Sequence, residues 1–268
     1  MMMTTVTSSP GTVSALRGSR AAARVVALAA LCLSALVNAA DTQTIFTPFD
    51  ALLRSDVRNG QVNYPAFAES TAFAQMIDAL ATTTPTKNAT QAERLAFYIN
   101  AYNAVSIQGI LDGYSPSSIW GRQRFFKRRK YDLFDTSLSL YTLEHERIIS
   151  EGDPRIHFAI VCSSQSCPPL RSQVFTAADL DAELDAVTAA FINNSSSNRF
   201  DLDRRSAQLS RIFKWYGDEF EAAGNGNLGR FLARYVDDPA LRESLTNDEW
   251  DFEFLDYDWS LNGTPVDS

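Results

Sequence analysis

The sequence predicts an α+β fold: a single compact domain in which many helices surround a small mixed or antiparallel sheet, preceded by a signal peptide. Segments with apolar residues at helical spacing alternate with short apolar segments that are bounded by turn residues. No internal repeat and no internal linker of a domain-boundary type is visible. A chain of this length can build one sizeable core.

The first part of the chain has the layout of a secretory signal peptide. Three arginines precede an apolar run at residues 25–37, and small residues follow this run. We expect residues 1–39 to be the signal peptide, with cleavage after Ala39 or Ala40. The run of 13 residues is shorter than the roughly 20 that a membrane span needs.

Cleavage would leave one domain at residues 40–268 and would discard Cys32 with the leader. Loss of three Arg and no acidic residue moves the net charge from −8 to −11. Such an acidic surface repels nucleic acid and anionic membranes, so we expect neither partner. The sequence therefore predicts an exported, periplasmic or secreted protein without stable membrane insertion, whose partner is an unknown small-molecule or peptide ligand. No cofactor is predicted.

The first elements are expected at residues 46–80. A short helix at 46–53 is followed by the turn signal Asn59-Gly60 and a brief extended piece at 62–64. Pro65 can open a helix that runs to about residue 80, with apolar side chains at helical spacing.

The clearest helix is expected at residues 91–111. Its apolar residues recur at helical spacing, and Gly113 then ends it. Asn100 and Asn103 interrupt the apolar surface on one face. Two interpretations stay open for this pair: buried amides that fix one element against another, or a polar wall of a ligand pocket.

The middle of the chain is expected to hold a hairpin and a buried strand. The segment 122–130 is basic, and its cluster at 127–130 is interpreted as a solvated edge, or alternatively as a surface that receives an acidic substrate or partner. Short strands are expected at 131–134 and 139–141. Thr142 is the expected N-cap of a helix that ends at Ile149. The nearly continuous apolar run at 156–162 predicts a strand that is buried on both faces.

The last part should be mostly helical with one more hairpin. The periodicity predicts helices at residues 177–192, 212–220 and 228–235. Strands are expected at residues 200–202, 207–209 and 252–257.

Both histidines and the two cysteines that would survive processing lie within 23 residues, as His145, His157, Cys162 and Cys167. These side chains most readily transfer protons, attack as nucleophiles or bind metals near neutral pH. On an extended strand, His157 and Cys162 would face opposite sides, because they are five residues apart. His145 is therefore the freer candidate to meet a thiol.

Three uses of this cluster stay open. Cys162 and Cys167 are close enough in sequence for a disulfide, worth about 2 kcal/mol by loop closure. Alternatively, one of them is a catalytic thiol at a strand end or a helix start. A third possibility is a zinc site made of both histidines and both cysteines, with Glu144 as an additional carboxylate.

Several motifs together resemble one known family, the domain of unknown function 547. They are Phe97-Tyr98-Ile99-Asn100-Ala101-Tyr102-Asn103-Ala104, Leu143-Glu144-His145, Asp153-Pro154-Arg155-Ile156-His157-Phe158-Ala159, Cys162 with Ser166-Cys167-Pro168, Phe213-Lys214-Trp215-Tyr216 and Tyr257-Asp258-Trp259-Ser260-Leu261-Asn262. One departure is Tyr98, where the family usually has Trp. The resemblance implies no established reaction. In some eukaryotic members a similar domain is joined to a glutaredoxin-like domain, which favours thiol chemistry.

The leading hypothesis is an exported thiol-dependent enzyme that acts by acyl transfer or amide hydrolysis. Cys162 or Cys167 would attack, and His145 would take the proton. Glu144 or an asparagine would orient the imidazole, and His157 would line the site. The alternatives are a non-enzymatic binding or scaffold domain with a structural 162–167 disulfide, and a periplasmic thiol redox protein.

Overall fold

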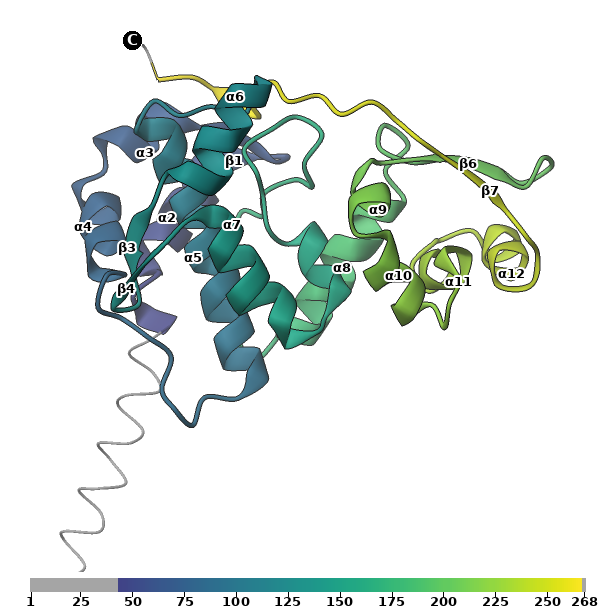
Figure 1. Cartoon of the computed structure of the whole chain (residues 1–268), viewed down its shortest axis with the longest axis horizontal. Coiled ribbons are helices and arrows are strands. Elements are labelled where there is room, and N and C mark those ends of the chain that lie inside the picture. Colours follow the sequence, from purple (N-terminus) through teal and green to yellow (C-terminus); the bar gives the residue numbers. More distant parts are fainter. Residues whose placement is uncertain (1–42, 267–268) are drawn as a thin grey trace, which may run out of the picture. The chain divides into compact units, whose positions relative to one another are not determined.

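A computed structural model describes residues 43–266, so the predicted signal peptide lies outside the described residues. The described part is an α+β fold with eleven α-helices and small sheets (Figure 1). The α-helices are α2 Thr47–Asp56, α3 Tyr64–Glu69, α4 Thr71–Ala79, α5 Gln91–Leu111, α6 Ile119–Arg122, α7 Leu140–Leu143, α8 Leu180–Ile192, α9 Ile212–Trp215, α10 Gly217–Ala223, α11 Leu228–Ala233 and α12 Pro239–Asn247.

The described strands form three separate small sheets, where the sequence predicted one. They are β1 Val57–Arg58, β2 Gln61–Asn63, β3 Tyr131–Leu133, β4 Thr136–Leu138, β5 Arg199–Asp201, β6 Ser206–Leu209, β7 Asp251–Phe254 and β8 Gly263–Thr264. The sheets β1-β2-β8 and β5-β6-β7 are mixed, because β8 and β7 join their hairpins in parallel. The third is the antiparallel hairpin β3-β4.

Helix α5 is the central element of the larger core and has the predicted bounds. A capping box fixes its start: the Glu93 N–H donates to Thr90 Oγ1 at 3.2 Å, and the Thr90 N–H donates to Glu93 Oε2 at 2.7 Å. It packs against α3, α4, α7 and α8, and nearly all of its residues from Leu95 to Gly109 are buried. This burial on all sides explains why α5 carries so few charged side chains.

Two predicted helices are each divided in the structure. The one predicted at 65–80 is α3 and α4, because Ser70 is extended and its side chain accepts the Phe73 N–H at 3.1 Å, which starts a new helix. The one predicted at 212–220 is α9 and α10, which are separated at Tyr216.

The predicted strand at 156–162 is wrong. Asp153 caps a 3-10 helix at Pro154–Phe158, and its carboxylate accepts the Arg155 N–H at 3.0 Å. The Ala159 and Ile160 N–H groups then bond to the carbonyl of Ile156. An apolar run of this length is equally compatible with any buried backbone, so burial alone did not identify a strand. The argument that His157 and Cys162 face opposite sides therefore fails.

The predicted helix after Thr142 begins earlier. Ser139 is the N-cap, accepting the Thr142 N–H at 3.1 Å, and α7 follows it directly. The chain continues as one π-helical segment, Glu144–Ile148. Such wide turns are frequent at functional sites. The basic segment likewise forms a π-helical turn, Gln123–Arg128, after α6.

After β7 the chain runs back across the molecule to β8, which lies beside β2 (Figure 1). We call residues 255–262 the return segment. The Gln165 N–H donates to the Ser260 carbonyl at 2.9 Å, and the Ser166 N–H donates to the Asp258 carbonyl at 3.2 Å. The return segment therefore holds the loop that connects the two cysteines. Among the described residues, no helix is both long and apolar enough to span a bilayer.

Candidate functional site

One cavity of about 500 Å³ brings together the predicted reactive residues Glu144, His145, His157, Cys162 and Cys167. They come from the π-helical segment, the 3-10 helix and the cysteine loop. Aromatic side chains from α5, α9 and the return segment complete much of the wall. The other lining residues are Tyr102, Phe126, Lys127, Tyr141, Ile160, Pro168, Ile212, Trp215, Tyr216, Tyr257 and Trp259.

Cys162 and Cys167 form a disulfide, with their Cα atoms 6.2 Å apart. Both residues are partly exposed. The Cys162 N–H donates to Sγ of Cys167 at 2.9 Å, and the hydroxyl of Tyr257 lies 3.2 Å from each sulfur. Ser164 Oγ lies 3.0 Å from Sγ of Cys162. Because the sulfur atoms are bonded to each other, the four-residue zinc set is not formed.

The described residues also contain no other group of three or more His, Cys, Asp or Glu side chains that could hold a metal ion.

The Tyr257 hydroxyl is a donor at the disulfide. Burial raises the pKa of Tyr257, and its hydrogen bond with Ser164 lowers it to a smaller extent. The phenol thus keeps its proton at neutral pH and can donate to a sulfur atom that gains negative charge.

The Glu144 carboxylate is buried and is held by two tyrosines. The hydroxyl of Tyr216 donates to Oε1 at 2.5 Å, and that of Tyr102 donates to Oε2 at 3.4 Å. Burial raises the pKa of both tyrosines, and the negative charge of Glu144 raises it further. Both phenols therefore stay protonated and donate to the carboxylate.

The two imidazoles have different surroundings. His157 is buried and stacks on Tyr216 with ring centroids 3.6 Å apart, and its Nε2 lies 3.1 Å from Oε2 of Glu219. Its Nδ1 is buried without a hydrogen-bond partner in the described part of the chain. His145 is exposed, and its Nδ1 lies 3.0 Å from the Tyr141 carbonyl oxygen.

Within the described residues, no hydrogen bond joins either imidazole to a sulfur atom or to Glu144. The predicted orientation of an imidazole by Glu144 is therefore absent from this arrangement. Glu219, which the sequence did not single out, holds His157 instead.

Asn100 and Asn103 lie outside this cavity, and each holds backbone of another segment. Asn100 Nδ2 donates to the Phe175 carbonyl at 2.8 Å, and its Oδ1 accepts the N–H of the same residue at 2.9 Å. Asn103 Nδ2 donates to the Ala159 carbonyl at 2.9 Å, and its Oδ1 accepts the Val161 N–H at 2.8 Å. Both residues therefore fit the first interpretation, in which buried amides fix one element against another. Neither residue lines the cavity.

Sequence reasoning assigned no site role to the tyrosines and tryptophans of the cavity. Trp215 and Tyr216, and likewise Tyr257 and Trp259, belong to motifs that carried the family resemblance, which was the available signal. Because these residues are distant in sequence from the cysteine cluster, their place in the cavity wall was not predicted.

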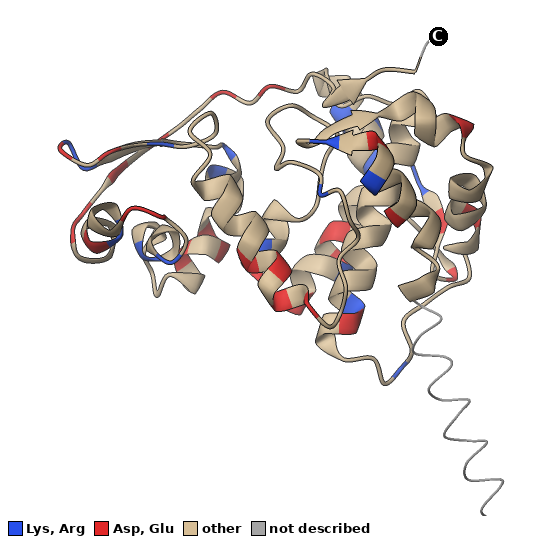
Figure 2. Ribbon diagram, turned by 180° about the vertical axis from the view of Figure 1, so that it is seen from behind, with Lys and Arg blue, Asp and Glu red and all other residues tan. Residues whose placement is uncertain are grey.

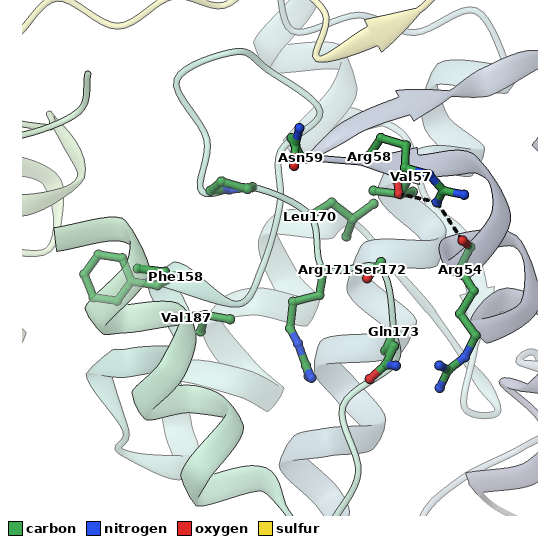
Figure 3. Close-up of a pocket in the computed structure, with 13 residues that line it drawn as sticks. Arg54, Val57, Arg58, Asn59, Phe158, Leu170, Arg171, Ser172, Gln173 and Val187 are labelled. Atoms are coloured by element: carbon green, nitrogen blue, oxygen red, sulfur yellow. Dashed lines mark hydrogen bonds between the residues drawn. The ribbon is translucent and has the colours of Figure 1, made fainter. Parts of the chain in front are cut away.

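A second cavity, of about 630 Å³, is lined by three arginines and by no histidine or cysteine (Figure 3). Arg54 pairs with Asp50 at 2.6 Å, and Arg171 pairs with Glu183 at 3.0 Å. Arg58 donates to the carbonyls of Arg54 and Val57 (Figure 3). These cations are already engaged, so the cavity with the disulfide is the stronger candidate site.

Residues 86–192 match the family model described as "Protein of unknown function, DUF547". The matched residues include five predicted reactive residues, Glu144, His145, His157, Cys162 and Cys167. Trp215, Tyr216 and the return segment lie beyond the matched residues. Neither the search of curated proteins nor the search of solved structures found a match.

Proposed function

We propose that this chain, which carries a DUF547 family domain at residues 86–192, is a thiol-dependent enzyme that performs thiol–disulfide exchange. One observation carries the proposal: both cysteines of the 162–167 disulfide line a cavity, where the Tyr257 hydroxyl lies 3.2 Å from each sulfur. A disulfide that only staples a loop needs neither a substrate-sized cavity nor hydroxyl donors at its sulfur atoms.

In the exchange, a substrate thiolate attacks Sγ of Cys162, and a mixed disulfide forms as the 162–167 bond breaks. The electron pair of that bond leaves on Sγ of Cys167. The Cys162 N–H at 2.9 Å and the Tyr257 hydroxyl at 3.2 Å are placed to stabilise this thiolate. The backbone donor is fixed in place, which favours Cys167 as the leaving group.

A second thiol of the substrate then attacks the mixed disulfide and releases Cys162 as a thiolate. The substrate leaves as a disulfide, and the protein holds two thiols, so two electrons have moved to the protein. An external disulfide compound restores the starting state by the same steps in reverse. Glu144 and His157 line the cavity and are assigned to substrate binding and proton transfer, and His145 lines it with an exposed imidazole.

Export remains part of the proposal. The signal-peptide pattern supports it, and disulfides persist in the periplasm and outside the cell. The ligand is proposed to be a small thiol compound or a peptide. The net charge of −8 argues against nucleic acid, and Figure 2 shows acidic and basic residues interspersed over the helices of the described part.

Acyl transfer or amide hydrolysis by the reduced enzyme is the second candidate. The cavity that holds the sulfur atoms also contains His145, His157 and Glu144, which are suitable acid–base groups. After reduction, a thiol and an imidazole would share one cavity. A reduced-only esterase activity towards a p-nitrophenyl ester, lost on replacement of His157 by Gln, would favour this reaction.

Trapping of the mixed disulfide tests the exchange reaction. In a Cys167→Ser variant, Cys162 should form a stable adduct with a cysteine-containing peptide disulfide, which intact-mass measurement detects. The Cys162→Ser variant, which keeps only Cys167 of the pair, is the matched control, and comparison of the two rates shows which sulfur forms the mixed disulfide. Equal and slow reaction of both variants, together with no exchange by the native protein, would support the scaffold alternative with a structural disulfide.

A further inference from the structure

Among residues 43–266, the buried carboxylate of Glu144 has no cationic partner. Its two hydrogen bonds come from the neutral hydroxyls of Tyr216 and Tyr102. Every ion pair in the described part of the chain involves other residues. Hydrogen bonds satisfy the oxygen atoms, but they leave a negative charge that burial has removed from much of the solvent.

Aromatic rings line the same cavity as this carboxylate. Tyr257, Trp215 and Trp259 pack against one another: the Tyr257 ring centroid lies 4.8 Å from that of Trp215 and 4.4 Å from that of Trp259, and the two tryptophan centroids are 5.6 Å apart. The faces of such rings attract cations, and the attraction increases when the cation is desolvated. A carboxylate together with tryptophan and tyrosine rings is the usual chemistry of a site for an organic cation.

The protein's own cations show that rings at this cavity accept positive charge. Lys127 Nζ lies 4.5 Å from the ring centroid of Tyr141, and the Arg122 guanidinium lies 4.6 Å from that of Trp259. Neither cation forms an ion pair with Glu144 in the described structure. The charge of Glu144 therefore remains available to a ligand.

We propose that this cavity binds a primary alkylammonium group, such as a lysine side chain of a peptide, with Glu144 as its anionic partner. The inference deepens the proposed function and rests on the cavity being the substrate site. A substrate peptide would then carry a lysine near its reactive cysteine. Lys127 lies on the Tyr141 ring and Arg122 on the Trp259 ring, so the Glu144 carboxylate and the rings of Tyr257 and Trp215 are left to the ligand.

Binding of peptides without sulfur tests this separately from thiol exchange. The probes are acetyl-Gly-Lys-Gly-amide and its norleucine and glutamate counterparts, measured against the full protein in its disulfide form by calorimetry. The lysine peptide should bind about 10-fold or more tightly than the norleucine peptide. Equal binding of the two, or tighter binding of the glutamate peptide, would overturn the proposal.

The Glu144→Gln variant should lose the preference for lysine, because the amide keeps the shape and removes the charge. Glu146→Gln is the matched control: it removes one charge from an exposed neighbour and should keep the preference. If Glu144→Gln does not fold, as judged by circular dichroism, the comparison of lysine with norleucine on the native protein still decides. Lysine preference without any thiol exchange would refute the proposed reaction alone, and exchange without lysine preference would refute this inference alone.

Discussion

The buried amide of Asn103 should contribute more to the free energy of unfolding than most other single side chains around the disulfide. Asn103→Ala removes the acceptor of the Val161 N–H and the donor to the Ala159 carbonyl, which lie 2.8 and 2.9 Å from the amide. Both backbone groups belong to buried residues, and Cys162 follows immediately. Water cannot replace the lost partners without opening the core.

Each buried backbone group left without a partner costs about 1–3 kcal/mol, so the loss of partners for both groups should destabilise the fold by roughly 2–6 kcal/mol. For a domain of this size, where 1 kcal/mol shifts the melting temperature by about 2–4 °C, the melting temperature should fall by roughly 4–24 °C. Urea unfolding followed by circular dichroism gives the free energy, and Asn88→Ala is the control. Asn88 is exposed and makes no hydrogen bond through its side chain in the described structure, so its loss should change stability by less than about 0.5 kcal/mol.

An equal effect of Asn103→Ala and Asn88→Ala would refute this reasoning. Residues 159–161 would then obtain their backbone hydrogen bonds from elsewhere, as they would in the strand that the sequence predicted at 156–162. A large loss of stability with the 162–167 disulfide still formed is the expected result.

Three further results are expected. Ala101→Leu should overpack the fully buried face of α5 and lower the unfolding free energy by roughly 1–3 kcal/mol; an unchanged urea midpoint would count against that packing. Burial is the main cause that raises the pKa of Tyr131 to about 12, so the unfolded chain loses this proton near pH 10 before the folded protein does. The contribution of Tyr131 to the free energy of unfolding should be fully present below pH 10 and should be lost by about 2 kcal/mol towards pH 12. The Tyr131→Phe variant should show a smaller loss over this range. Identical urea midpoints of the native protein from pH 9 to pH 11.5 would contradict this prediction. Tyr257→Phe should slow opening of the disulfide by glutathione about 10-fold, because the leaving thiolate loses a donor; an unchanged rate would exclude that role.

Helix α5 could be predicted to its terminal residues because its signals are local. The capping box of Thr90 and Glu93, the apolar spacing and Gly113 after its end all lie within or beside the helix. Its neighbour along the chain was harder, since the division at Ser70 depends on one side chain that caps a helix in place of continuing it.

The segment 156–162 could not be predicted from its composition. Its apolar side chains are buried as expected, but the backbone finds its partners in the Asn103 side chain and in a 3-10 turn. These partners are distant in sequence or depend on the Asp153 cap. A continuous apolar run predicts that a segment is buried, but it does not by itself distinguish a strand from another buried backbone conformation.

The cluster of histidines and cysteines indicated the position of the cavity, because all four residues occur within 23 positions and nowhere else in the predicted mature chain. The roles within it depended on long-range placement. Tyr257 reaches the disulfide from 90 residues away along the chain, carried by the return segment. No local pattern around Cys167 could predict that contact.

Exchange of the native disulfide with a small thiol is the most direct test of the central claim. The folded protein is incubated with millimolar reduced glutathione, quenched with iodoacetamide and analysed by intact mass, while circular dichroism monitors the fold. We expect glutathione adducts and alkylated cysteines at Cys162 and Cys167 in protein that is still folded. If the disulfide opens only when urea unfolds the chain, it is a structural staple, and the proposed thiol–disulfide exchange is wrong.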